Sequence, residues 1–191
     1  MSSKYKVADD SQPHFLTFTV LQWIDVFSRE CYRETLLESL TYCIANKGLR
    51  LHAWVIMSNH IHLVASMKDG HSMSGFVRDF KKFTAKKIVS AVNSNPAESR
   101  REWMMRAFSR AGQFNNNNEI VQFWEQDYHP IVLSTPGRLA QRMAYLHQNP
   151  VRAGIVWEPQ DYKYSSAGDY ILGKEGLLPL VKLEVHGVVL W

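Results

Sequence analysis

Cysteine is scarce in this sequence of 191 residues, and long apolar runs are absent. The two cysteines, Cys31 and Cys43, are twelve positions apart and form no CxxC pair. We therefore expect reduced thiols packed as small apolar side chains. A membrane-spanning helix would need a run of about 18 apolar residues, and the sequence contains none. The first ten residues lack the apolar core of a signal peptide. These absences favour a cytoplasmic protein.

Basic residues only slightly outnumber acidic residues. The formal net charge is +4 and the isoelectric point is about 9.1, which fits a polyanionic partner and equally a merely basic surface. Apolar residues make up 46% of the chain and charged residues 21%, a composition typical of globular proteins. A length of 191 residues predicts a single domain. No internal repeat is evident.

The stretch MSNHIHLV, residues 57–64, contains two histidines on either side of one isoleucine. In a strand, side chains two positions apart lie on the same face, so His60 and His62 would stand side by side. Such a pair can bind one divalent cation, can be hydrogen-bonded together, or can be accidental. A metal site would need a third ligand, and the spacing alone does not supply one.

Hydrophobic patterning predicts strands and helices in alternation. The predicted strands are Pro13–Val20, Leu49–Val55 and His60–Ser66, the last two joined as a hairpin. The predicted helices are Phe27–Asn46, Ser74–Val92 and Arg138–Asn149, and we expect Pro150 to end the last one. Between the second and third helices, Trp103–Phe108 reads as a short apolar piece between loops. Ile120–Trp124 and Pro130–Leu133 then form a strand pair or one broken strand.

This order predicts an α+β protein with a ferredoxin-like antiparallel sheet, β-α-β-β-α-β, with helices on one face and an additional C-terminal helix. The opposite face would then be free for a site or a partner. We expect a core over about residues 13–170 and a C-terminal tail, residues 171–191, whose role stays open.

Two further patterns bear on chemistry. The helix Ser74–Val92 has a basic outer face, which is either simply solvated or a track for DNA phosphates; its members are Arg78, Lys81, Lys82, Lys86 and Lys87. Tyr145 and Asn149 are four residues apart, so they share one face of the third helix. Without other information, they read as a core aromatic and a helix cap.

Three motifs together resemble the REP-associated tyrosine transposases, which are single-tyrosine HUH transposases. The motifs are MSNHIHLV, AYLHQNPVRAGIV and DYKYSSAGDY, and the similarity extends over about residues 13–170. The resemblance implies that His60 and His62 bind one Mg²⁺ or Mn²⁺ and that Tyr145 is the nucleophile. Related enzymes have Gln four residues after the tyrosine as a third ligand. Here Asn149 takes that position, with Gln148 as a neighbouring rival.

The implied activity is metal-dependent nicking and joining of single-stranded DNA at hairpins through a 5′-phosphotyrosine intermediate. Arg152 and the basic face of the second helix are the expected DNA contacts. Two other interpretations stay open: a non-catalytic hairpin-binding relative and, more weakly, a ferredoxin-like RNA-binding module. Both a monomer and a homodimer are compatible with the family. His52, His129 and His147 are weaker candidates as metal ligands.

Overall fold

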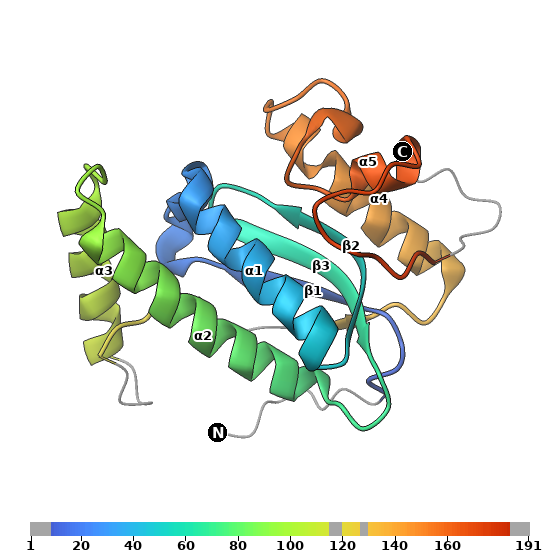
Figure 1. Cartoon of the computed structure of the whole chain (residues 1–191), viewed down its shortest axis with the longest axis horizontal. Coiled ribbons are helices and arrows are strands. Elements are labelled where there is room, and N and C mark those ends of the chain that lie inside the picture. Colours follow the sequence, from blue (N-terminus) through green and yellow to red (C-terminus); the bar gives the residue numbers. More distant parts are fainter. Residues whose placement is uncertain (1–8, 115–119, 127–129, 184–191) are drawn as a thin grey trace.

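The α+β class and the antiparallel sheet are confirmed by the structure, a computed structural model that describes residues 9–114, 120–126 and 130–183 (Figure 1). The strands are β1 (His14–Thr19), β2 (Leu49–Ile56), β3 (His60–Met67) and β4 (Ile131–Val132). The helices are α1 (Glu30–Asn46), α2 (Met73–Ser94), α3 (Arg101–Gln113), α4 (Pro136–Arg152) and α5 (Ala167–Ile171). Short 3-10 turns occupy Leu21–Trp23, Val26–Ser28 and Pro159–Asp161.

The sheet has the order β2-β3-β1-β4, and its pairings are antiparallel. β2 and β3 form the predicted hairpin. β1 lies beside β3 in a register that pairs Thr17 with His62 and Thr19 with His60. The two histidines therefore lie in the interior of the sheet, with a threonine of β1 next to each.

Both faces of the sheet are covered by helices. Figure 1 shows α1 and α2 side by side over one face, where Phe18 of β1 lies 5.4 Å from Phe80 of α2. Phe15 points to the other face, because it is three positions away on the same strand, and there its ring lies 6.1 Å from Tyr145 of α4. The face that we expected to be free is thus the one that α4 covers.

α4 continues past Pro150, contrary to the prediction that this proline ends it. The helix runs to Arg152, and the chain leaves it at Gly154, whose φ of 70° suits glycine. Proline has no backbone N–H to donate to the carbonyl of Leu146, so the helix continues with one hydrogen bond fewer, and the ring of Pro150 is buried. As a result Asn149 lies inside a regular helical turn and not at a cap.

The region between α2 and α4 also differs from the prediction. The expected short apolar piece is the 13-residue helix α3, in which Met104 and Phe108 are buried one turn apart. Trp124 pairs with Val20, and β4 pairs with the opposite end of β1. Both pieces of residues 120–133 therefore pair with the β1 segment, as one broken strand would, and not with each other, as a strand pair would.

The described part of the C-terminal tail packs on the sheet. The backbone N–H of Val181 donates to the carbonyl of Leu51 at 2.8 Å, along the outer edge of β2. Further along the same edge, the N–H of Ile56 donates to Tyr164 and the N–H of Ser166 donates to Trp54. Among the described residues, no helix combines the length and apolar character that crossing a membrane requires.

Candidate active site

The two histidines of MSNHIHLV stand next to each other on β3. Their ring centres are 4.7 Å apart, with the planes inclined at 69°. His62 is buried and His60 is half-buried, and both point to the sheet face that α4 covers. The shared face that strand alternation predicted is confirmed.

Each ring has one nitrogen engaged by the protein, which leaves the other available. Nδ1–H of His60 donates to the side-chain oxygen of Asn59 at 2.7 Å. Nδ1 of His62 lies 2.8 Å from Thr17 Oγ1, and in the tautomer that donates this bond its Nε2 carries a lone pair. Nε2 of His62 is buried and has no hydrogen-bond partner among the described residues. The amide oxygen of Asn59 can only accept, so it fixes the tautomer of His60 with a lone pair on Nε2, and the Thr17 contact is compatible with the same tautomer in His62.

Burial keeps both rings neutral. It lowers the pKa of His60 to about 4 and that of His62 to about 3, where the nearby charges of His60 and Arg142 act in the same direction. Removal from water disfavours the imidazolium form. Since the neutral imidazole is the form that binds metal ions, the pair is ready to act as a ligand at neutral pH.

Tyr145 is brought to His62 by α4. Thr135 caps this helix by accepting the backbone N–H of Arg138, and Pro136 occupies its first turn. The Tyr145 ring lies 5.6 Å from the His62 ring in an edge-to-face arrangement. Seven residues further along the helix, about two turns, the guanidinium of Arg152 lies 5.4 Å from the centre of the Tyr145 ring. The phenol is thus held between an imidazole and a cation.

Asn149 of α4 lines a pocket beside His60, and neither His62 nor Tyr145 is among the residues that line this pocket. Its side-chain nitrogen Nδ2 is buried and has no hydrogen-bond partner among the described residues. Asn149 and His60 line one open pocket of about 700 Å³, and Gln148 is not among its lining residues. Trp23, Asp25, Asn59, Arg100 and Ile155 are among the other residues that line it.

The candidate metal ligands are few: two imidazole nitrogens and one amide group. Within the described ranges, no group of three or more His, Cys, Asp and Glu side chains is placed to hold a metal ion. Among the described residues, Asn149 is an amide side chain that lines the same pocket as His60. The unpaired Nε2 of His62 is the observation that favours a ligand here, because a buried polar atom without a partner is costly.

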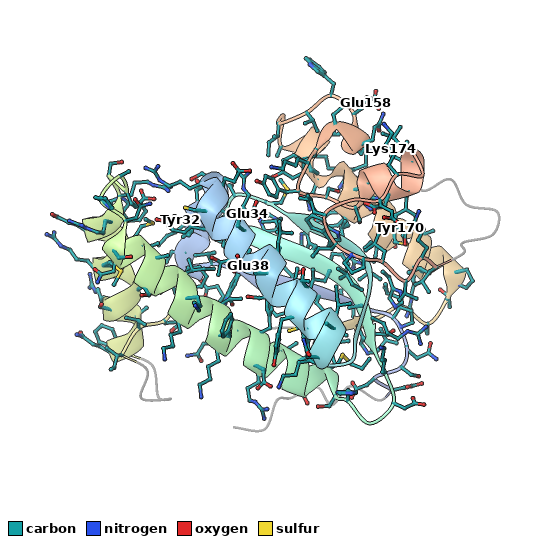
Figure 2. The ribbon with its side chains drawn as sticks, in the orientation of Figure 1. Tyr32, Glu34, Glu38, Glu158, Tyr170 and Lys174 are labelled. Carbon is teal, nitrogen blue, oxygen red and sulfur yellow. The ribbon has the colours of Figure 1, made fainter. Side chains whose placement is uncertain are left out.

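His52 and His147 have partners away from the candidate site. His52 binds the Val181 carbonyl through Nδ1 (2.7 Å) and the Ser66 hydroxyl through Nε2 (2.9 Å). His147 is buried on α4 and contacts the Ser166 hydroxyl at 3.0 Å; its ring lies 5.5 Å from that of Tyr170, labelled in Figure 2. His147 thus points away from Tyr145, as helix geometry predicted. His129 lies outside the described residues.

The predicted DNA contacts divide between the two faces of the sheet. Arg152 is at the site, beside Tyr145. The basic residues of α2 are on the opposite side of the sheet: Lys82, Lys86 and Lys87 are exposed there and line a groove between α1 and α2 that also contains Glu38, an acidic residue labelled in Figure 2. In the same helix, Arg78 pairs with Asp79 at 2.9 Å and Lys81 donates to the Glu125 carbonyl. The structure does not bring the basic face of α2 to the histidines.

Sequence reasoning missed four residues at the site. Thr17 and Asn59 bind the two histidines, and Trp23 and Arg100 line the pocket. Asn59 is adjacent to His60 in the motif, so its proximity was visible. Thr17, Trp23 and Arg100 meet the histidines only through strand register and loop folding, for which the sequence offers no short-range signal.

Comparison with known proteins places the fold among transposases. The family model "Transposase IS200 like" matches residues 11–123, well over half of the chain, including both histidines. One similar solved structure is a REP-associated tyrosine transposase bound to a REP hairpin: it is 14% identical, the match covers 99% of each chain, and the TM-score is 0.60. Another is a candidate transposase from Deinococcus radiodurans R1, 20% identical over 78% of this chain and 97% of that chain, with a TM-score of 0.44. No curated protein matches the chain.

Proposed function

Since the chain belongs to the family of IS200-like transposases, we propose that it nicks and rejoins single-stranded DNA, with Tyr145 as the nucleophile. The observation that carries this proposal is the contact between the Tyr145 and His62 rings at 5.6 Å, on the side of the sheet where the Nε2 of His62 is buried and unpaired. A phenol and two neutral imidazoles in one place are the groups needed for metal-assisted phosphoryl transfer.

The proposed substrate is a DNA hairpin with a single-stranded flank. The similar structure with a TM-score of 0.60 is bound to a REP hairpin, and we extend that class of substrate to this chain. The net charge of +4 is compatible with a polyanion.

The reaction exchanges one phosphodiester for another. The phenolic oxygen of Tyr145 attacks the phosphorus, the bond from phosphorus to the 3′ oxygen breaks, and the proton lost by the phenol is balanced by the proton gained by the released 3′-hydroxyl. The product is a 5′-phosphotyrosine bond of similar energy to the bond that was broken. A 3′-hydroxyl of another strand can reverse the step, so rejoining requires no ATP.

His60 and His62 would hold one Mg²⁺ or Mn²⁺, with Asn149 as the candidate third ligand. When bound, such a cation draws charge from the phosphoryl oxygens and stabilises the in-line transition state. Imidazole nitrogen is a softer donor than the oxygen ligands that Mg²⁺ prefers. Mn²⁺ is therefore expected to support the reaction at least as well as Mg²⁺.

The remaining residues of the site orient the nucleophile. The α4 backbone sets the phenol against His62, and Arg152 lies over the phenol ring at 5.4 Å. A guanidinium in this position can donate to a phosphate oxygen as the phosphate approaches the hydroxyl. Phe15 contacts the rings of both His62 and Tyr145, which excludes water from the inner side of the site.

A second candidate function is hairpin binding without cleavage. It is favoured by Asn149, which has a shorter side chain than the Gln of related enzymes, and by the lack of a third His, Cys, Asp or Glu ligand among the described residues. Intact His60, His62 and Tyr145 weigh against it.

One experiment separates these functions. The protein is incubated with a panel of end-labelled hairpin oligonucleotides and Mn²⁺, and a denaturing gel detects a covalent adduct. We expect an adduct with the wild type and with Tyr42→Phe, a control at an exposed tyrosine of α1, and its loss in Tyr145→Phe and His60→Ala. An adduct formed by Tyr145→Phe would refute the assigned nucleophile, and binding without any adduct would support the second candidate.

A further inference from the structure

The loop after β1 holds an exposed tryptophan in an unfavourable backbone conformation. Gln22 and Trp23 have φ values of 53° and 57°, and no other described residue except glycine has a positive φ. Such a conformation costs free energy for residues with a side chain and persists only where the surroundings enforce it. The Trp23 side chain gains only partial burial in return, because the residue is 59% exposed.

The surroundings that enforce this loop are those of the candidate active site. Nδ2 of Asn59 donates to the Trp23 carbonyl at 3.2 Å and to Oδ1 of Asp25 at 3.0 Å, while Oδ1 of Asn59 accepts the proton of His60 Nδ1. The Trp23 ring lies 5.4 Å from the His60 ring, edge to face. One side chain, Asn59, therefore fixes both the tautomer of His60 and the position of the tryptophan.

Arg100 borders the same pocket as a rigidly held cation. Its Nε and Nη2 donate to the two oxygens of Glu98 at 2.9 and 3.0 Å, and its Nη1 donates to the Asp25 carbonyl at 2.9 Å. Glu98 is 3% exposed. A guanidinium has five N–H groups, so two remain without a hydrogen bond to the described residues. The side chain of Arg100 is 27% exposed, which allows these groups to meet a ligand.

We propose that the pocket between Trp23 and Arg100 binds one unpaired nucleotide of the DNA strand next to the phosphate that is cut. The base stacks on the Trp23 ring, and a phosphate oxygen accepts from the unused N–H groups of Arg100. This inference rests on the proposed function, since His60 and Asn149 line the same pocket and the nucleotide would adjoin the reacting phosphate.

The chemistry of the pocket favours a single-stranded segment. A base can stack on an indole only when its own neighbour in the duplex is displaced, and aromatic platforms with adjacent cations are the usual means of holding single strands. The volume of about 700 Å³ lies in the range of pockets that hold a small ligand. The strained loop is then explained, because it presents a flat ring to the ligand at a fixed distance from His60.

The test measures equilibrium binding in the Tyr145→Phe background, so that no cleavage intervenes. The probes are the hairpin oligonucleotides with single-stranded flanks on both sides, with one flanking nucleotide at a time made abasic. We expect Trp23→Ala to weaken binding about tenfold, and Trp23→Phe to recover most of the loss. The control is Trp157→Ala, at a tryptophan that is 94% exposed and does not line the pocket.

The abasic series identifies the stacked base. At one flanking position, removal of the base should weaken binding by the same factor as Trp23→Ala, and the two changes together should cost no more than either alone. In a second arm, Arg100→Gln should reduce the slope of log affinity against log salt by about 0.7, as for one phosphate contact on a single strand. Arg106→Gln, at an exposed arginine of α3, is the control.

The outcomes distinguish this inference from the proposed function. If the wild type forms the covalent adduct but Trp23→Ala binds as tightly as Trp157→Ala, the nucleotide pocket is refuted and the transposase chemistry stands. If binding falls equally for each abasic position and in Trp23→Ala, the tryptophan does not read a defined nucleotide and the inference is also refuted. If no oligonucleotide of the panel binds, both proposals fail together.

Discussion

Removing the hydroxyl of Thr17 should weaken metal binding at the candidate site, because this hydroxyl contacts His62. Thr17 Oγ1 lies 2.8 Å from Nδ1 of His62, and Thr17→Val replaces this hydroxyl with a methyl group of the same shape. Valine suits a strand at least as well as threonine, so β1 is expected to keep its structure. What changes is the hydroxyl that can accept the Nδ1 proton of His62 and so favour the tautomer with a free Nε2.

Two quantities follow from this loss. A buried ring nitrogen left without a partner costs about 1–3 kcal/mol in the free energy of unfolding. The loss of a residue that orients a metal ligand typically weakens metal binding about 10- to 100-fold. We therefore expect the Mn²⁺ concentration that gives half of the maximal rate of adduct formation to rise by that factor, with a smaller effect on the rate at saturating Mn²⁺.

The assay combines urea unfolding with single-turnover adduct formation over a range of Mn²⁺ concentrations. The matched control is Thr19→Val: Thr19 pairs with His60 in the same register, but the Nδ1 of His60 is bound by Asn59. Thr19→Val should leave the half-saturating Mn²⁺ concentration unchanged. If Thr17→Val destabilises the fold yet has the metal dependence of Thr19→Val, the hydroxyl is structural only and the argument about the tautomer is wrong.

Two more predictions concern stability and the third ligand. The guanidinium of Arg100 holds the pKa of Glu98 at about 2, below the ordinary 4.5; because the folded-state pKa is the lower one, this stabilisation is complete above about pH 5 and is lost as the pH falls toward 2, by roughly 3 kcal/mol. The free energy of unfolding, measured with urea, should therefore decline less between pH 5 and pH 2.5 in Glu98→Gln than in the wild type. An equal decline in both proteins would contradict this. Asn149→Ala should raise the half-saturating Mn²⁺ concentration about tenfold or more, whereas Gln148→Ala should not. An effect of Gln148→Ala alone would assign the third ligand to Gln148.

Local patterns predicted the parts of the site that depend on a single element. The alternation of side chains along a strand placed His60 and His62 on one face, and the helical repeat placed Tyr145 and Asn149 on another. Both relations were correct because each depends only on the backbone of one element. The role of Tyr145 came from the resemblance to a known family, not from spacing.

The relations between elements were not visible in the sequence. The register that pairs Thr17 with His62 depends on how β1 and β3 align, and a shift by one residue would have turned Thr17 to the other face. The loop that contains the left-handed residue Trp23 is held by a hydrogen bond from Asn59, 36 positions away, and by one from the N–H of Gln22 to Glu125. Pro150 also misled, because the preference of proline for helix ends is a local rule that the packing of α4 overrides.

The position of the basic face of α2 has a topological cause. A connection between parallel strands of one sheet is right-handed, and this applies to α1 between β1 and β2 and to α2 between β3 and β4, which puts both helices on the same face. α4 follows the last strand, is not bound by that rule, and covers the other face with Tyr145.

The sheet therefore separates the lysines of α2 from the phenol. A DNA stem touching both would have to pass an edge, and at the β2 edge the segments around Ser166 and Val181 occupy the backbone groups. The edge formed by β4 is only two residues long. Three arginines of the described residues lie at the candidate site: Arg152 over the Tyr145 ring, Arg142 over the Phe15 ring at 5.3 Å, and Arg100 at the pocket. Arginine binds phosphate oxygens in a fixed, two-pronged geometry, whereas lysine acts as a mobile point charge. Contacts that must position a phosphate for attack are thus expected from the arginines, and any contribution of the α2 lysines is expected to be long-range attraction that salt screens.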